Sequence, residues 1–267
     1  MMRDNIMFWL LMCGHLLGDF YFQSQKLVNE KKNSKVSLVK HSLIYMVAIF
    51  LLLTPIASWR ILLILVCISI SHFVVDSIKL IIIKYTKESN FFNKNSFCLD
   101  QIVHIAIIFI IAYNYAINKM IALNALGNVF VEVYNNLQIA LTPEIFIRLI
   151  FAFLLIGKPA NILIKIINQK KNLHMQDNNV SVSILENKQN KPEFQNAGRI
   201  IGTLERIIII IMVMLKQYAA IGLVFTAKSI ARYDEITKDP SFAEYYLVGT
   251  LLSVLIAISA VLIIQPI

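Results

Sequence analysis

RILLILVCISISHFVVDSIKLIIIK, residues 60–84, decides the fold class of this chain, because it is an apolar run with a histidine and an aspartate inside it. The run exceeds the roughly 20 residues with which a helix crosses a bilayer. His72 and Asp76 are four residues apart, slightly more than one helical turn, and so share one helix face. Ionisable groups inside a membrane span are costly and mark a functional site by default. The stretch therefore predicts a membrane helix with a functional polar site.

Composition extends this prediction to the whole chain. Of its 267 residues, 58% are hydrophobic, against roughly 45–50% in a soluble domain. We expect an all-α, polytopic helical membrane protein with about seven transmembrane helices, within a range of six to eight. The spans are predicted near residues 5–25, 41–58, 61–84, 99–117, 144–166, 200–228 and 243–265.

Two segments allow a second interpretation. Residues 120–141 are amphipathic, which is typical of a helix lying on the outer membrane surface. The stretch 207–227 is long enough to span, but Lys216 and Gln217 interrupt it. Two short, broken helices there would give eight spans; seven is the preferred number.

Charge sets the expected orientation. Every second loop is basic, namely 26–40, 84–98 and the polar segment 167–198, so these loops are expected in the cytoplasm. The N-terminus would then lie outside and the C-terminus inside. The net charge of +9 follows from these loops, and no compact basic face indicates nucleic-acid binding. Cys13, Cys67 and Cys98 show no CxxC spacing and are read as reduced apolar residues.

The predicted organisation has four parts along the chain. Residues 1–117 form a four-helix membrane unit, 118–166 the outer amphipathic segment and fifth span, 167–198 a flexible cytoplasmic loop, and 199–267 the C-terminal membrane helices.

Four of the five histidines lie in or beside apolar stretches, and three of these have an aspartate four residues away. In the predicted topology all three pairs have the same polarity, with Asp nearer the cytoplasm and His roughly 6 Å deeper. A fourth histidine starts the second span on the same side. We therefore predict one layered site that opens to the cytoplasmic leaflet. Its residues are the pairs His15/Asp19, His72/Asp76 and Asp100/His104, with His41.

Imidazole and carboxylate together suit a divalent metal such as zinc, iron or manganese. A bound metal activates water for hydrolysis, and a carboxylate beside that water can act as general base. Haem is disfavoured, since its His ligands need no carboxylate one turn away. The metal ligands are predicted to be His15, His41, His72, His104, Asp19, Asp76 and Asp100, with Asp19, Asp76 and Asp100 as catalytic carboxylates.

A second polar group follows Gly198, and we call it the C-terminal polar cluster. Gly198 and Gly202 form a small-xxx-small pair that permits close helix approach. Basic residues at a cytoplasmic helix entrance are what the positive-inside rule predicts, while contact with an anionic lipid head group is the functional alternative. Lys216 is expected to pair with Glu205 or with an aspartate of the first site. The cluster comprises Arg199, Glu205, Arg206 and Lys216.

The chain resembles the bacterial membrane family called domain of unknown function 3307. The similar segments are HLLGDFYFQSQKL (15–27), SHFVVDSIKL (71–80) and DQIVH (100–104). Three C-terminal segments resemble the longer members of the family: GRIIGTLER, QYAAIGLVFTAKSIARY and EYYLVGTLLS. The resemblance implies a multi-span protein of the bacterial inner membrane, with lipids as partners. It implies no settled activity.

Three functional hypotheses follow, and whether the protein is an enzyme stays open. The leading one is an integral membrane protein with a metal-dependent hydrolase site acting on a lipid or another amphiphile. The second is a proton- or cation-coupled carrier in which the same groups relay protons. The third is a non-catalytic membrane protein whose polar cluster only assembles the helix bundle. The sequence does not indicate the oligomeric state.

Overall fold

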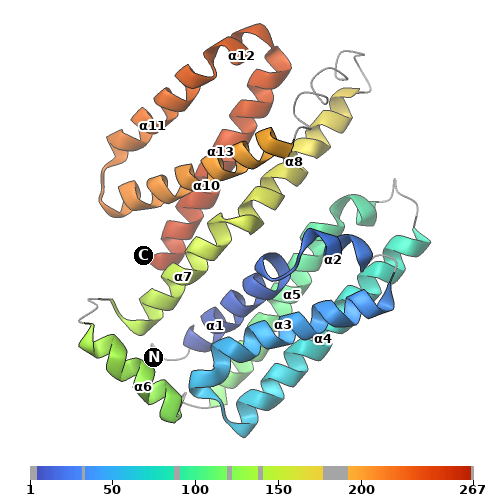
Figure 1. The fold of residues 1–267 in the computed structure, drawn as a ribbon, viewed down its shortest axis with the longest axis vertical. Coiled ribbons are helices and arrows are strands. Elements are labelled where there is room, and N and C mark those ends of the chain that lie inside the picture. The colour runs from blue at the N-terminus through green and yellow to red at the C-terminus, as the bar shows by residue number, and fades with distance from the viewer. Residues whose placement is uncertain are drawn as a thin grey trace. The chain divides into compact units, whose positions relative to one another are not determined.

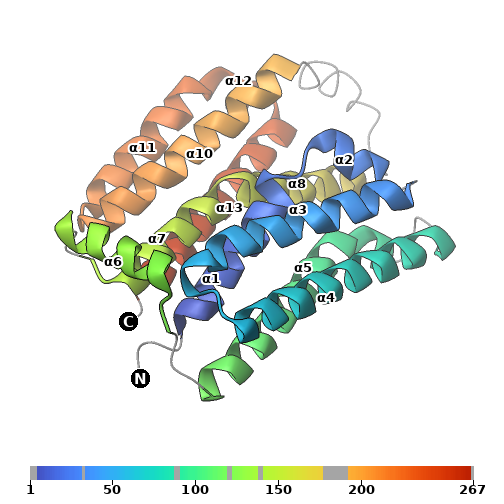
Figure 2. The same ribbon diagram turned by 60° about the horizontal axis from the view of Figure 1, so that its bottom comes forward.

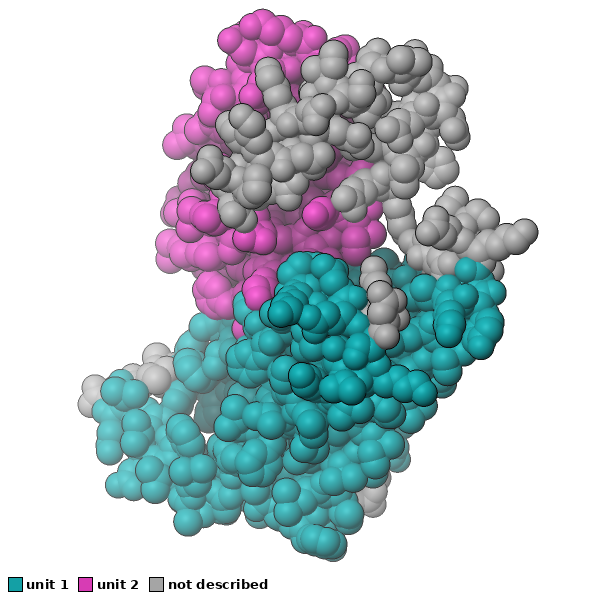
Figure 3. All heavy atoms as spheres, turned by 45° about the vertical axis from the view of Figure 1, so that its right-hand side comes forward, with its two compact units in different colours: residues 1–151 teal, residues 152–267 magenta. Residues whose placement is uncertain are grey.

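The computed structural model describes residues 5–31, 34–86, 91–118, 122–137, 141–176 and 192–265. In these ranges the regular elements are helices, and no strand occurs. The all-α prediction is therefore confirmed. The chain divides into two compact units, Met1–Phe151 and Ala152–Ile267 (Figure 3).

Four long helices make the core of the first unit (Figures 1 and 2). They are α1 (Asn5–Leu16), α3 (Lys35–Leu53), α4 (Trp59–Tyr85) and α5 (Phe91–Asn118). Helix α1 packs on α3 and α5, and α4 also packs on α3 and α5. The four helices thus close into a ring whose interior can hold side chains from all of them.

Short polar side chains set where two of these helices begin. Ser34 accepts a hydrogen bond from the Ser37 amide at the start of α3, and Ser58 accepts one from Ile61 at the start of α4. Such N-caps satisfy amides that have no partner within the helix. Helix α3 therefore starts at Lys35, earlier than the predicted residue 41.

Helix α1 continues into a π-helical turn, η1 (Leu17–Tyr21), followed by the short helix α2 (Gln25–Glu30). The first apolar helix thus ends at Tyr21 rather than near the predicted residue 25. Gly14 and Gly18 lie where α1 meets α3: a Cβ added at Gly18 would be 2.7 Å from Tyr45 Cδ2, and one at Gly14 would be 2.8 Å from Ile49 Cγ1. The close contact between α1 and α3 therefore requires glycine at both positions.

The predicted amphipathic segment contains helix α6 (Ala125–Asn136). The Asn124 side chain caps this helix and also donates to the Thr54 carbonyl at 2.6 Å, which fixes α6 to the end of α3. Gly127 is buried there, because any Cβ would be 2.2 Å from the Pro55 carbonyl oxygen. Large apolar side chains of α6, including Val129, Phe130 and Val133, are exposed.

The boundary between the units falls within α7 (Pro143–Ile156). The second unit contains α8, α10, α11, α12 and α13, and α13 packs on α8, α10 and α12. Their bounds are Lys158–Gln176, Pro192–Met214, Tyr218–Ala231, Tyr233–Lys238 and Pro240–Ile264.

The prediction of a single span over 200–228 is wrong. Helix α10 ends at Met214 and α11 begins at Tyr218. Between them the Gln217 amide bonds the Met212 carbonyl at 2.8 Å and the Lys216 amide bonds Val213 at 3.0 Å, while Lys216 has φ of 58°. This is the hydrogen-bond pattern of a Schellman motif, in which a left-handed residue ends the helix. The alternative of two shorter helices describes the structure.

Five helical segments of the described residues are long and apolar enough to cross a membrane, and Ile6–Tyr21 and Tyr218–Ala231 are shorter apolar helices. The chain is therefore compatible with a multi-pass membrane protein, but the predicted count of seven spans is not confirmed. The five segments are Lys35–Ile56, Trp59–Tyr85, Asn95–Tyr115, Pro143–Asn168 and Pro240–Ile264.

The predicted loop 167–198 is helical at both ends, since α8 continues to Gln176 and α10 starts at Pro192. The central parts of the three predicted cytoplasmic loops, residues 32–33, 87–90 and 177–191, lie outside the described residues.

Candidate metal centre in the first unit

The four ring helices bring all three His/Asp pairs and the fourth histidine together in the first unit. Helix α1 with η1 contributes one pair, α3 the lone histidine, and α4 and α5 one pair each. We call this group the His/Asp cluster: His15, Asp19, His41, His72, Asp76, Asp100 and His104. Its members come within hydrogen-bond or ion-pair distance of one another across helices, as the predicted convergence requires.

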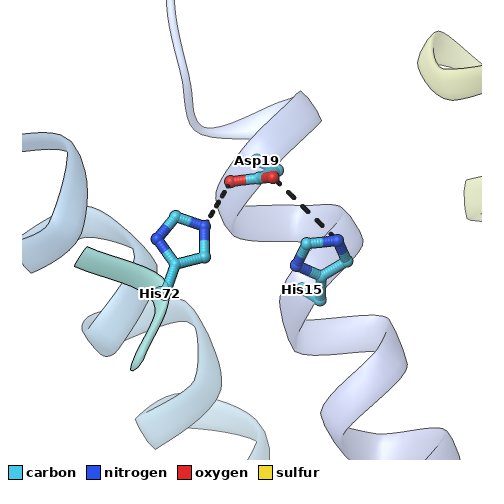
Figure 4. Close-up of side chains that lie close together, drawn as sticks. All are labelled: His15, Asp19 and His72. Carbon is cyan, nitrogen blue, oxygen red and sulfur yellow. Dashed lines mark hydrogen bonds and ion pairs between the residues drawn. The ribbon is translucent and has the colours of Figure 1, made fainter. Parts of the chain in front are cut away.

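Asp19 lies between two of the helices (Figure 4). Its Oδ1 is 2.9 Å from His72 Nε2 of α4 and 3.2 Å from His41 Nε2 of α3. Its Oδ2 accepts a hydrogen bond from the Gln101 amide at 3.2 Å and lies 3.9 Å from His15 Nε2. One carboxylate therefore connects α1, α3, α4 and α5.

Asp76 contacts different partners with its two oxygens. Its Oδ2 is 3.5 Å from His41 Nε2 and 2.9 Å from the Lys31 ammonium, whereas its Oδ1 is 4.0 Å from His104 Nε2. The histidine one turn away on the same helix, His72, bonds Asp19 instead. The partners of Asp76 therefore come from neighbouring elements.

Asp100 and His104 do pair within one helix, with His104 Nε2 3.4 Å from Asp100 Oδ1. The other oxygen of Asp100 accepts from the Lys79 ammonium at 2.7 Å. The His104 ring stacks on the His72 ring with centroids 4.3 Å apart. The Tyr45 ring also stacks on His72, with centroids 3.7 Å apart.

The side chains of the cluster are almost entirely buried. Its histidines and Asp76 are at most 3% exposed, and Asp100 is 7% exposed. Within the described residues, several of its buried atoms have no hydrogen-bond partner, although ion-pair contacts lie nearby. These atoms are His15 Nδ1, His41 Nδ1 and Nε2, His72 Nδ1, His104 Nε2 and Asp100 Oδ1. Buried polar groups without partners are costly, so these atoms make the cluster a candidate ligand site.

Three sets of donor atoms in the cluster lie close enough together to hold a metal ion, each within 4.8 Å. They are His15/Asp19/His72, His41/His72/Asp76 and Asp76/Asp100/His104.

Residues 7–134 match the family model described as protein of unknown function (DUF3307). This segment is a DUF3307 domain. The resemblance seen in the sequence motifs is thereby confirmed for this part of the chain, and the C-terminal motifs lie beyond the match. No curated protein and no solved structure matches the chain.

Every residue of the His/Asp cluster lies inside the DUF3307 domain. The domain also supplies three cluster neighbours that the sequence analysis missed: Lys31, Lys79 and Tyr45. Lys79 carries a detectable signal, since it is a charge in an apolar run three residues after Asp76. Lys31 is one of five lysines in a basic loop, so nothing local distinguishes it.

The C-terminal polar cluster lies in the second unit, beyond the DUF3307 match, and its members have separate roles. Arg206 is buried and donates to the Ile156 carbonyl, Asn161 Oδ1 and Ser253 Oγ at 2.7, 2.6 and 3.2 Å. It thereby joins α7, α8, α10 and α13, an interhelical role that the sequence analysis did not foresee.

Of the two partners expected for Lys216, Glu205 is taken by another lysine. Glu205 pairs with Lys228 at 2.8 Å, and Lys228 also donates to Thr250. Lys216 lies exposed in the turn after α10, and Arg199 is also exposed. The glycine pair does not make the expected close contact either: among described atoms none lies within 4 Å of a Cβ at Gly198, and the nearest to one at Gly202 is Arg206 Nη1 at 3.5 Å.

Proposed function

We propose that the DUF3307 domain holds a divalent metal ion in the His/Asp cluster and uses it for hydrolysis within a membrane. The observation that carries this proposal is the spacing of four donor atoms from three helical elements, η1, α3 and α4. His72 Nε2 to Asp19 Oδ1, His41 Nε2 to Asp19 Oδ1, and His41 Nε2 to Asp76 Oδ2 measure 2.9, 3.2 and 3.5 Å.

These separations suit the first shell of a metal. With metal–ligand bonds of roughly 2.0–2.1 Å, the ligands of a tetrahedral zinc ion lie about 3.3 Å apart. Two imidazoles and two carboxylates also suit iron or manganese. His41 Nε2 is within reach of both carboxylates, yet it makes no hydrogen bond in the described residues. We assign His41, His72, Asp19 and Asp76 as ligands.

His15 and Gln101 are assigned to positioning. Gln101 accepts from His15 Nε2 at 3.1 Å and donates to Asp19 Oδ2 at 3.2 Å. Partners of this kind orient a ligating carboxylate and tune its basicity.

The hydrolytic part of the proposal rests on the carboxylates beside the metal ligands. A bound metal would provide activated water near neutral pH, and a neighbouring carboxylate can accept its proton. The more exposed edge of the cluster is marked by Lys31 and Lys79, whose side chains are 14% and 24% exposed. We propose that a lipid or another amphiphile approaches from this edge.

The proposed setting is the bacterial inner membrane, crossed by seven helices with the N-terminus outside. The five apolar segments supply most of these spans, and Ile6–Tyr21 and one helix of the α10–α11 pair supply the others. The edge of the cluster marked by Lys31 and Lys79, here called the lysine edge, then faces the cytoplasm. Membrane lipids surround the helices as partners.

A proton or cation carrier is the second candidate. Polar contacts run from Gln101 through Asp19 to His72, and from His41 through Asp76 to Lys31. Chains of Asp and His relay protons in membrane pumps. The ion pairs with Lys31 and Lys79 favour this reading, because they compensate two carboxylates without a metal.

Replacement of Asp76 by Asn tests the proposal. The amide keeps the shape of Asp76 and one acceptor oxygen, can still hydrogen-bond across helices, and removes the charge. If the cluster serves assembly only, the loss is small, since interhelical hydrogen bonds in membranes average roughly 0.6 kcal/mol. We expect Asp76→Asn to keep near-normal thermal stability and to lose most of its bound metal.

The measurement is elemental analysis of the detergent-purified full chain, with thermal unfolding in parallel. Asp234→Asn, a surface carboxylate whose side chain is 81% exposed, is the control and should bind metal normally. A wild-type chain that binds no zinc, iron or manganese would rule out the metal centre and leave the carrier. Metal that persists in both Asp76→Asn and His72→Ala would rule out the assigned ligands.

A further inference from the structure

A second group of donor atoms shares Asp76 with the four proposed ligands but uses its other oxygen, Oδ1. It comprises His104 Nε2, Asp100 Oδ1 and Asp76 Oδ1. His104 Nε2 is 3.4 Å from Asp100 Oδ1 and 4.0 Å from Asp76 Oδ1. The His104 and Asp100 side chains are 3% and 5% exposed.

Two of these three atoms need a partner. His104 Nε2 and Asp100 Oδ1 are both buried and make no hydrogen bond within the described part of the chain. The two atoms lie 3.4 Å apart, and both side chains are buried. A cation between them would be bound by the carboxylate oxygen and by the imidazole lone pair at once.

The remaining carboxylate oxygens of Asp100 and Asp76, their Oδ2 atoms, have other partners. Asp100 Oδ2 accepts from Lys79 at 2.7 Å, which orients the carboxylate and leaves Oδ1 directed toward His104. Asp76 Oδ2 belongs to the first ligand set, where it lies 3.5 Å from His41 Nε2. Asp76 therefore presents one oxygen to each group, as a carboxylate that bridges two metal ions does.

We infer that the DUF3307 domain binds a second divalent transition metal ion at Asp76, Asp100 and His104, with Asp76 bridging it to the first. This inference rests on the proposed function and deepens it. Three protein ligands leave the second ion with open positions. Paired metals can hold both the attacking and the leaving oxygen of a displacement, so an ester, above all a phosphate ester, is the substrate class that this centre fits.

The test is metal stoichiometry in the detergent-purified full chain, stripped with a chelator, reloaded with Mn²⁺ and desalted. We expect two ions per chain in the wild type and in the control Asp234→Asn. Asp100→Asn and His104→Gln should each retain one ion, because the first ligand set is intact. Size-exclusion chromatography of each variant checks that it is folded.

Electron paramagnetic resonance of the wild type provides a readout that needs no variant. A pair of Mn²⁺ ions bridged by Asp76 gives an exchange-coupled spectrum, whereas one ion gives the spectrum of isolated Mn²⁺. One ion per chain with an uncoupled spectrum overturns the second site and leaves the proposed function standing. No bound ion overturns both. Two ions that persist in Asp100→Asn and His104→Gln overturn the assignment of these ligands.

Discussion

At the scale of single residues, the partners of the carboxylates are the decisive feature. Asp19 lies on the π-helical turn η1, and π turns inside helices occur frequently at functional sites. Asp76 is 2% exposed and has Lys31 at 2.9 Å. In the proposed metal centre, this ammonium group competes with the metal for Asp76 Oδ2.

Replacing Lys31 by Met should therefore tighten metal binding. Hydrogen bonds to charged groups contribute roughly 1.5–3 kcal/mol, so we expect the metal Kd to fall by about tenfold or more. Without metal the variant should melt at a lower temperature, because Asp76 loses its main counter-charge in a buried setting. Competition with a chromophoric chelator measures the affinity.

Lys26→Met is the matched control for this prediction. Lys26 is on the same short helix, but its pair with Glu30 is long, at 3.8 Å, and its side chain is 85% exposed. It should leave both metal affinity and melting temperature unchanged. If Lys31→Met weakens metal binding, Lys31 supports the site and does not compete for it.

At the scale of helices, glycine spacing controls how closely α1 approaches α3. Gly14 and Gly18 are four residues apart on one face of α1, and small residues at this spacing let membrane helices pack closely. The neighbour of Gly18 is Tyr45, whose ring stacks on His72. This helix contact therefore also positions the site.

Gly18→Ala should destabilise the first unit by about 1–3 kcal/mol, the usual cost of overpacking. The new Cβ would be 2.7 Å from Tyr45 Cδ2 and 3.1 Å from Tyr45 Cα, so the backbone of α3 has to move. Gly198→Ala, which meets no described atom within 4 Å, should be neutral or slightly stabilising. Thermal unfolding in detergent compares them, and equal melting temperatures would contradict the close contact.

The break between α10 and α11 depends on backbone conformation at one residue. Lys216 has φ of 58°, a region that costs residues with a Cβ roughly 1–2 kcal/mol. Lys216→Gly should remove this cost, and after the entropy that glycine adds to the unfolded chain the gain is expected to be up to about 1 kcal/mol.

Gln217→Gly provides the comparison, since Gln217 has φ of −95° and gains nothing from glycine. It should lower the melting temperature slightly while Lys216→Gly raises it. A lower melting temperature for Lys216→Gly would contradict the left-handed turn and favour a continuous helix across 200–228.

At the scale of the whole molecule, the membrane orientation decides which side the lysine edge of the site faces. From their basic residues, the positive-inside rule predicts that residues 26–40, 85–98 and 167–198 lie in the cytoplasm.

A single cysteine introduced near Lys32, in a chain without its three native cysteines, should not react with an impermeant maleimide added outside intact cells. The same cysteine should react after the membrane is permeabilised. A cysteine at Asn136, in the segment proposed to lie outside, should react in intact cells and serves as the positive control. Labelling near Lys32 from outside would reverse the orientation and the side on which the site opens.

Local patterns in the sequence were sufficient for the all-α class of fold and for the seven His and Asp residues that come together, but not for their neighbours Lys31, Lys79 and Tyr45. That these residues form a functional site stays a prediction. Hydropathy and helical spacing depend only on neighbouring residues, so they predicted helices and placed each His and Asp on a helix face. Together with the predicted topology, they also indicated that the three His/Asp pairs lie at a similar depth in the membrane. The spans over α4 and α13 matched the structure within a few residues.

Only the tertiary structure decided which groups meet, because the contacts join residues that are far apart in sequence. Asp19 and His72 are 53 residues apart, Lys31 and Asp76 are 45 apart, and His15 and Gln101 are 86 apart. The order of helices around the ring brings Asp19 to His72 and Asp76 to Lys31, so neither aspartate makes its shortest contact with the histidine one turn away on its own helix. Lys216 and Gln217 marked an interruption in the apolar run, but the left-handed turn between α10 and α11 has no local signal, since lysine has no preference for that region.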